Sequence, residues 1–278
     1  MSVILAQKRS EFRKLHDTGC FVIPNPWDVG SAALLHSLGF KALASTSAGF
    51  AWSVGRPDYG LKRDDVLQHL TMLSAATDLP VNADYENGFA DSPEDVAASV
   101  TQCVATGVAG LSIENRTNDP KKPLYDDALA IERIRASRRA IDATGSNVML
   151  VARCEGFLVG QPDLAATIKR LQAFAEAGAD CLYPPGISTK EQISAVVKAV
   201  APKPVNILIG GKTDLTVPVL AELGVRRVSL GGALARAAWG GFMRAALEIR
   251  DKGTFNEFGN AHPGAELQKI FAAPRRAS

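Results

Sequence analysis

Three acidic residues close two successive apolar runs of the chain, and their positions favour metal chemistry. Asp84 and Glu86 follow the run that begins at Leu79, and Glu114 follows the run 110–113. A carboxylate at the end of a buried strand costs free energy unless a positive charge lies beside it. Asp84 and Glu86 are two residues apart, so a continuous strand would place both on one face. The pattern therefore predicts a bound divalent cation.

The chemistry of these three residues indicates which cation to expect. All are oxygen donors, which favours Mg²⁺, with Mn²⁺ as the alternative, over zinc. The histidines, which would favour zinc, fall in expected helices or in the tail, at positions 16, 36, 69 and 262. A second interpretation stays open, in which the carboxylates pair with Arg153 and Arg116 and hold no metal.

Arg153 ends another apolar run and carries a permanent charge. A guanidinium can form two parallel hydrogen bonds to one carboxylate. Two interpretations follow: Arg153 forms an ion pair with Glu114 or Glu155, or it binds an anionic substrate beside the metal. The segment 45–49 (Ser-Thr-Ser-Ala-Gly) supplies hydroxyls and backbone N–H groups suited to holding a carboxylate. Its alternative is a turn of small residues whose hydroxyls are satisfied locally.

The elements that must position these residues alternate short β-branched runs with helical stretches. Ser92 and Pro93 open one helix, which stops at Gly107, and another runs from Leu164 to Gly178. Eight strands, each followed by a helix, predict a (β/α)₈ TIM barrel, with a doubly wound open sheet as the alternative. Barrel enzymes collect their active-site residues at the carboxyl ends of the strands. The expected strands are 21–25, 41–47, 81–84, 110–114, 148–153, 181–184, 204–209 and 227–230.

The 278 residues show no linker or composition break, so a single domain over 1–278 is expected. An N-terminal helix (about 4–17) and a C-terminal segment (about 264–273) lie outside the repeat. Helices outside a closed barrel often bury apolar surface against another subunit, which predicts a homo-oligomer.

Composition excludes several classes of partner. A net charge of +2 and 6% aromatic residues argue against nucleic acid. No apolar run approaches the ~20 residues of a membrane span, and the N-terminus lacks a signal-peptide pattern. The four cysteines are scattered, which is typical of reduced thiols, so a cytoplasmic protein is expected.

Four segments together resemble the isocitrate lyase/phosphoenolpyruvate mutase superfamily, in order and spacing, over roughly residues 20 to 235. They are residues 46–58, 81–89, 112–115 and 151–153. The resemblance implies a (β/α)₈ barrel whose last helix is exchanged with a neighbouring subunit, usually in a dimer of dimers. It also implies Mg²⁺ held largely through water by Asp84, Glu86 and Glu114.

The same resemblance implies roles for the remaining site residues. Asp58 matches the acidic residue near the metal that positions water or substrate, and Arg153 matches the arginine that stabilises negative charge on the substrate. The substrate carboxylate would be held by the small-residue turn, which here is Thr46, Ser47 and Ala48.

Departures from the family pattern narrow the expected activity. Glu86 stands where the family usually has aspartate, and Asn115 stands where aspartate commonly follows the glutamate. The isocitrate and methylisocitrate lyases carry a Lys-Lys/Arg-Cys-Gly-His loop, but the corresponding stretch 115–125 contains no cysteine and no histidine. This argues against both activities. The gating loop of the phosphonate enzymes is matched only faintly, at residues 120–123.

The expected function is a Mg²⁺-dependent lyase that cleaves a C–C bond of a small 2-oxo or 2-hydroxy di- or tricarboxylate through an enolate. The alternatives are a P–C bond enzyme acting on phosphonopyruvate and a catalytically silent carboxylate-binding protein. Lys121 or Lys122 is a candidate for binding a second anionic group. Tyr59, Tyr125 and Glu155 are candidate proton donors that the sequence does not rank.

Overall fold

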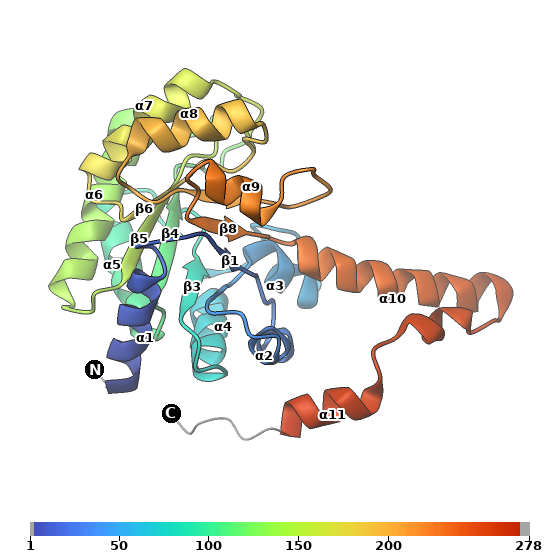
Figure 1. The fold of residues 1–278 in the computed structure, drawn as a ribbon. Helices are drawn as coiled ribbons and strands as arrows, with labels where there is room; N and C mark the ends of the chain where they lie inside the picture. The colour runs from blue at the N-terminus through green and yellow to red at the C-terminus, as the bar shows by residue number, and fades with distance from the viewer. Residues whose placement is uncertain (1–2, 273–278) are drawn as a thin grey trace.

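The computed structural model describes residues 3–272 and places a curved assembly of parallel strands at the centre of the molecule (Figure 1). Five strands pair in the order β2-β3-β4-β5-β6, and three pair in the order β1-β8-β7. All pairs are parallel, as strand–helix repeats require. The strands are β1 Phe21–Ile23, β2 Leu43–Ala44, β3 Val81–Asp84, β4 Gly110–Glu114, β5 Met149–Arg153, β6 Cys181–Tyr183, β7 Asn206–Leu208 and β8 Arg227–Ser229.

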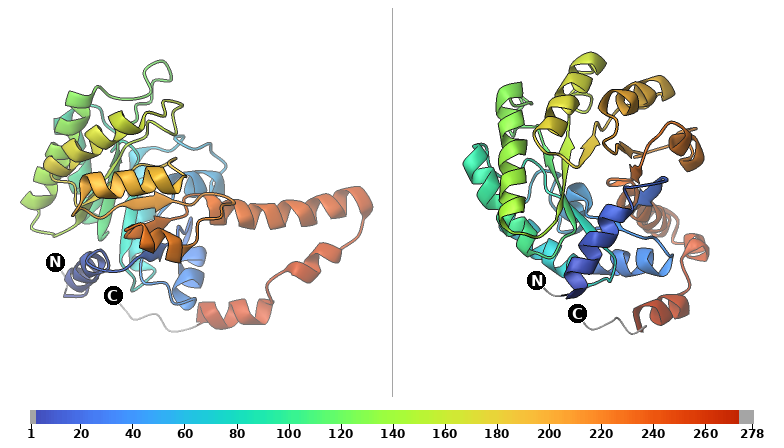
Figure 2. Two further views of the ribbon diagram at one scale, coloured as in Figure 1. Left: turned by 45° about the horizontal axis from the view of Figure 1, so that its top comes forward. Right: turned by 60° about the vertical axis from the view of Figure 1, so that its left-hand side comes forward.

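Contacts outside the regular strand pairing link the two sheets at both seams. Leu182 of β6 bridges Val205 beside β7, and the Ala44 N–H of β2 donates to the Pro24 carbonyl after β1 at 3.0 Å. The fold is therefore α/β, with parallel strands curled into a half-barrel and a smaller sheet facing it. Figure 2 shows the helices packed around the outside of this curl.

The helices begin and end largely where the sequence predicts. Ser92 caps α5 by accepting the Asp95 N–H at 3.1 Å, and α1 and α11 match the expected terminal segments, although residue 273 lies outside the described residues. No helix within residues 3–272 has the length and apolar character needed to cross a membrane. The helices are α1 Val3–Lys14, α2 Val29–Ser37, α3 Ser47–Ser53, α4 Arg63–Ala75, α5 Pro93–Ala105, α6 Asp127–Ala143, α7 Leu164–Glu176, α8 Lys190–Val200, α9 Val217–Glu222, α10 Ala233–Lys252, the 3₁₀ helix η1 Asn256–Asn260 and α11 Gly264–Ala272.

The end of β2 and the placement of Glu86 differ from the sequence prediction, and both differences bear on the site. The strand expected over 41–47 stops at Ala44, because Thr46 caps α3 by accepting the Gly49 N–H. β3 stops at Asp84, and Glu86 has φ +47, inside a turn. The strand alternation expected to place Asp84 and Glu86 on one face therefore does not reach Glu86.

Helix α10 projects away from the body of the protein, and the chain returns through η1 to α11, which packs against α2 (Figures 1 and 2). Ala235 is the one residue of α10 that is buried. Large apolar side chains remain exposed along this segment, including Trp239, Phe242 and Met243, with Phe242 61% exposed. A helix that exposes several large apolar side chains ordinarily packs against another protein surface.

Candidate active site

A cavity of about 330 Å³ opens at the carboxyl ends of the strands. The parallel arrangement brings these ends together, as the sequence analysis expects. Seven of the eight predicted site residues line the cavity: Thr46, Ser47, Ala48, Asp58, Asp84, Glu114 and Arg153. Glu86 does not line it, although its carboxyl group is close enough to Asp84 and Asp58 to be affected by their charges.

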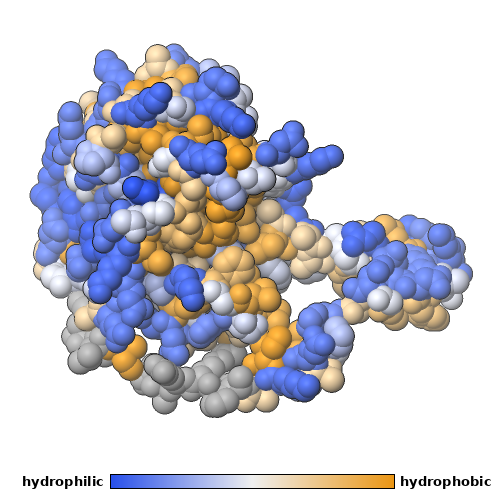
Figure 3. Space-filling view, in the orientation of Figure 1, coloured by the Kyte–Doolittle hydropathy of each residue, from blue (hydrophilic) through white to orange (hydrophobic). Residues whose placement is uncertain are grey.

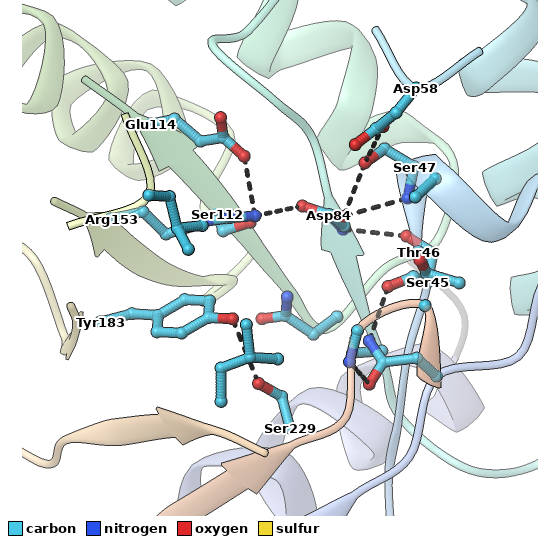
Figure 4. Close-up of a pocket in the computed structure, with 18 of the residues that line it drawn as sticks. Ser45, Thr46, Ser47, Asp58, Asp84, Ser112, Glu114, Arg153, Tyr183 and Ser229 are labelled. Carbon is cyan, nitrogen blue, oxygen red and sulfur yellow. Dashed lines mark hydrogen bonds and ion pairs between the residues drawn. The ribbon is translucent and has the colours of Figure 1, made fainter. Parts of the chain in front are cut away.

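Arg153 lies at the centre of the acidic cluster, between Glu114 and Asp84 (Figure 4). Its Nη1 is 2.7 Å from Asp84 Oδ1 and 2.7 Å from Glu114 Oε1, and its Nε is 2.9 Å from Glu155 Oε1. Burial lowers the pKa of Arg153, but these three carboxylates more than offset burial and raise it well above its usual range. The predicted pairing with Glu114 and Glu155 is therefore present, and the guanidinium remains charged.

Asp84 is also held from the opposite side by the start of α3 (Figure 4). Its Oδ2 accepts both the backbone N–H and the hydroxyl of Ser47 at 3.0 Å, and the same hydroxyl donates to Asp58 Oδ1 at 3.3 Å. The Thr46 hydroxyl is committed to capping α3. The predicted small-residue turn is thus the start of a helix. Fewer of its hydroxyl and backbone N–H groups are available to a ligand than the sequence suggests, because the Thr46 hydroxyl and the hydroxyl and N–H of Ser47 are already hydrogen-bonded.

The structure separates the three candidate proton donors. Tyr59 lines the cavity and donates its hydroxyl to Glu114 Oε2 at 3.0 Å, while the Arg116 guanidinium lies 3.9 Å above its ring. Burial and the nearby Glu114 charge raise the pKa of Tyr59, so its hydroxyl keeps its proton. The Tyr125 hydroxyl instead donates a hydrogen bond to Asp91 and accepts one from Asn87. Neither Tyr125 nor Glu155 lines the cavity.

The cluster contains more carboxyl groups than positive charges. Five carboxyl groups interact with the guanidinium groups of Arg153 and Arg116, namely those of Asp58, Asp84, Glu86, Glu114 and Glu155. Burial, followed by the Asp84 and Asp58 charges, raises the pKa of Glu86 to about 8. Burial also raises the pKa of Asp58 and that of Glu114. Burial and neighbouring carboxylates thus disfavour the charged forms of these groups, and a divalent cation among them would favour those charged forms.

Hydrogen bonding bears on whether these residues suit Mg²⁺. The buried Glu86 Oε1 has no hydrogen-bond partner among the described residues, as a group awaiting a cation or its water would. However, no three His, Cys, Asp or Glu side chains within residues 3–272 stand together as a direct ligand set. Asp84, Glu86 and Glu114 therefore suit a cation bound through water molecules better than one bound directly. The family resemblance implies the same mode of binding.

The sequence indicates Tyr183, Asn206 and Ser229 as polar residues near strand ends, but it does not single out Asn82 or Arg227 at the floor of the cavity. Asn82, Tyr183, Arg227 and Ser229 line the cavity with buried polar groups below the acidic cluster, and the buried Asn206 donates to Ser229 without lining the cavity itself. The available signal was alternation, because Asn82 precedes Asp84 by two residues and Arg227 precedes Ser229 by two, so each pair shares a strand face. Of the two candidate lysines, neither Lys121 nor Lys122 lines the cavity.

Comparison with known proteins places the chain in a family. A sequence model described as phosphoenolpyruvate phosphomutase matches residues 12–250. The chain belongs to the phosphoenolpyruvate mutase/isocitrate lyase superfamily. Within it, the chain is similar to uncharacterised proteins. A crystal structure of an uncharacterised lyase/mutase from Burkholderia cenocepacia J2315 superimposes with a TM-score of 0.96 at 48% identity, covering 99% of both chains.

Other relatives show the range of the superfamily. An uncharacterised Mycobacterium tuberculosis protein (strain H37Rv) is 33% identical over 92% of this chain and 94% of its own. The 2-methylisocitrate lyase of Escherichia coli K12 is 33% identical over 66% of this chain and 64% of its own. Structures of 2,3-dimethylmalate lyase and of phosphonopyruvate hydrolase with oxalate and Mg²⁺, both 25% identical, superimpose with TM-scores of 0.85 and 0.83. Each covers about 95% of both chains.

Proposed function

We propose that this protein is a Mg²⁺-dependent lyase that cleaves a C–C bond of a small 2-oxo or 2-hydroxy di- or tricarboxylate through an enolate. The supporting observation is the buried Arg153, which lies between Asp84 and Glu114 in a cavity with surplus carboxyl groups. Two relatives whose names describe lyases of di- or tricarboxylates, 2-methylisocitrate lyase and 2,3-dimethylmalate lyase, support this chemistry.

Asp84, Glu86 and Glu114 would hold the cation, which is Mg²⁺ or, alternatively, Mn²⁺. The oxalate and Mg²⁺ bound to phosphonopyruvate hydrolase support this choice, since oxalate has the shape of a 2-oxo acid enolate. When bound, the cation supplies a Lewis acid for the oxygen on which negative charge develops.

The chain's own residues would orient the substrate and stabilise its charge. Arg153 presents a fixed positive charge in a site shielded from water, where such a charge acts most strongly. The N-terminal residues of α3, Ser47 and Ala48, border the position of the substrate carboxylate, with Thr46 fixing the start of the helix. Asp58, hydrogen-bonded to Ser47, would position a water molecule or the substrate.

A panel of substrates tests this proposal directly. Purified protein is incubated with 2-oxo and 2-hydroxy di- and tricarboxylates, with Mg²⁺ or with a chelator, and products are identified by mass spectrometry. We expect at least one dicarboxylate to be split into two smaller acids only when Mg²⁺ is present. Tight binding without any product over hours would instead indicate a silent carboxylate-binding protein.

The second candidate function is P–C bond chemistry, which the phosphoenolpyruvate phosphomutase match and the phosphonopyruvate hydrolase structure support. Phosphorus NMR with phosphonopyruvate separates it from the leading proposal. Conversion to phosphoenolpyruvate, or to pyruvate and phosphate, would contradict the carbon–carbon lyase assignment.

We further propose that the strands close into a complete (β/α)₈ barrel and that α10 is exchanged with a neighbouring subunit in a homodimer or homotetramer. The projecting helix and its exposed apolar side chains support this arrangement, as do the apolar residues on the body beside the base of α10 (Figure 3). Light scattering of the purified protein is expected to give a mass of two or four chains. A monomer at micromolar concentration would contradict the exchange.

A further inference from the structure

Arg227, the first residue of β8, is a buried cation without an anionic partner. Its side chain lines the cavity floor, and the whole residue is only 2% exposed. Its Nε donates to Asn206 Oδ1 at 2.8 Å, and its Nη1 donates to Asn82 Oδ1 at 3.4 Å. No carboxylate of the described residues forms an ion pair with it, and its charged or titratable neighbours include Cys181, Tyr183, Arg153 and His16.

Other arginines of the chain show how unusual this environment is. Arg133 is equally buried, but its guanidinium donates to three backbone carbonyls, those of Ala90, Asp91 and Asn87. Arg116 has no ion pair among the described residues, but it is only partly buried, so water solvates it. Arg227 has two amide oxygens as acceptors and no such access to bulk water. A buried guanidinium in this condition is strongly stabilised by an added anion.

The position of Arg227 relative to the acidic cluster suggests which anion it would bind. It contacts Asn82, which precedes Asp84 by two residues in β3, a separation of about 7 Å along the strand. Arg227, Asp84 and Arg153 all line one cavity. A small dicarboxylate with one end at Arg153 therefore has its other end within reach of Arg227.

The floor around Arg227 offers further neutral groups to such an anion. Asn206 Nδ2 donates to Ser229 Oγ at 2.9 Å. The Ser229 hydroxyl in turn donates to the Tyr183 oxygen at 3.3 Å (Figure 4). These groups carry no negative charge, in contrast to the carboxylates around Arg153. The cavity thus has an acidic upper part and a basic floor.

We propose that Arg227 binds the second carboxylate of the substrate at the cavity floor. This inference rests on the proposed function and assigns the site a preference for dicarboxylates over monocarboxylates of equal length. Asn206 positions the guanidinium through the bond to its Nε.

The test uses Asn206→Asp, a change of nearly identical shape that gives Arg227 a carboxylate partner of its own. With Mg²⁺ present, affinities are measured by competition against oxalate for two pairs of 2-oxo acids. The four-carbon pair is oxaloacetate and 2-oxobutanoate, and the five-carbon pair is 2-oxoglutarate and 2-oxopentanoate. In the native protein we expect the dicarboxylate of at least one pair to bind about ten-fold more tightly or better, as a charge-assisted hydrogen bond implies.

In Asn206→Asp, this preference should fall to about two-fold or less, while oxalate affinity changes little, because oxalate is too short to reach the floor. Arg116→Gln is the matched control, and it should keep the preference. Three results would overturn the assignment. The native protein could show no preference for the dicarboxylate, Asn206→Asp could keep the preference, or Arg116→Gln could lose it. If Asn206→Asp does not fold, Arg227→Gln decides the question in the same assay.

The outcomes separate this inference from the function on which it rests. If the native protein fails to bind oxalate with Mg²⁺, the proposed function is at fault. If it binds oxalate and Asn206→Asp keeps the preference, only the role of Arg227 is wrong.

Discussion

Replacing Arg153 with glutamine is expected to lower turnover by about 10²- to 10³-fold, the loss typical of removing a fixed charge from an active site. It should also lower the free energy of unfolding by about 3–5 kcal/mol, because breaking a buried ion pair from one side leaves uncompensated charge. Here the side chains of Glu114 and Glu155 are fully buried, and both lose the positive charge of Arg153. Steady-state kinetics on a substrate from the panel and denaturant unfolding measure the two effects.

Two controls make the result interpretable. Arg138→Gln removes a partly buried arginine that is paired with Asp180, outside the cavity, and should leave turnover unchanged. Arg153→Lys keeps the charge but loses the fork that reaches Glu155 and the other two carboxylates, so it should recover stability better than activity. Native-like turnover in Arg153→Gln would contradict the role given to this guanidinium.

Replacing Asp84 with asparagine is expected to abolish Mg²⁺-dependent turnover, with a loss on the order of 10²-fold or more, while the fold stays intact. The amide keeps the shape of the side chain and can still accept a hydrogen bond from Ser47. Arg153 retains Glu114 and Glu155, so the cluster is not left with an unpaired cation. Glu114→Ala should lose turnover in the same way.

The measurement is turnover as a function of Mg²⁺ concentration, with circular dichroism to confirm the fold. Undiminished activity of Asp84→Asn at the Mg²⁺ concentration that saturates the native enzyme would refute the metal assignment. If a high Mg²⁺ concentration restores the activity of Asp84→Asn, the substitution weakens metal binding rather than the chemical step.

The residues that the sequence predicts best are those that close a strand. Asp84, Glu114 and Arg153 each end an apolar run, and parallel strands bring their carboxyl ends together, so their convergence follows from the pattern. Strand alternation predicts that Glu86 shares a face with Asp84, but this prediction is wrong because β3 ends two residues before Glu86, which lies in a turn with positive φ. Strand ends are set by tertiary contacts that local sequence does not contain.

The residues that were missed depend on contacts between distant parts of the chain. Arg227 meets Asn82 across the cavity, 145 residues earlier in the sequence, and nothing near either residue indicates the pairing. The cation–π contact of Arg116 with Tyr59 likewise arises only when two loops meet. An arginine at the start of a strand looks like an ordinary charged residue until the fold encloses it.

We propose above all that this cavity binds a divalent cation together with an enolate-like dianion. Calorimetric titration of oxalate into the native protein, once with Mg²⁺ and once with a chelator, tests it most directly. We predict saturable heat corresponding to one site per chain with Mg²⁺ and none with the chelator. Absence of heat with Mg²⁺, or equal binding in both titrations, would contradict the account.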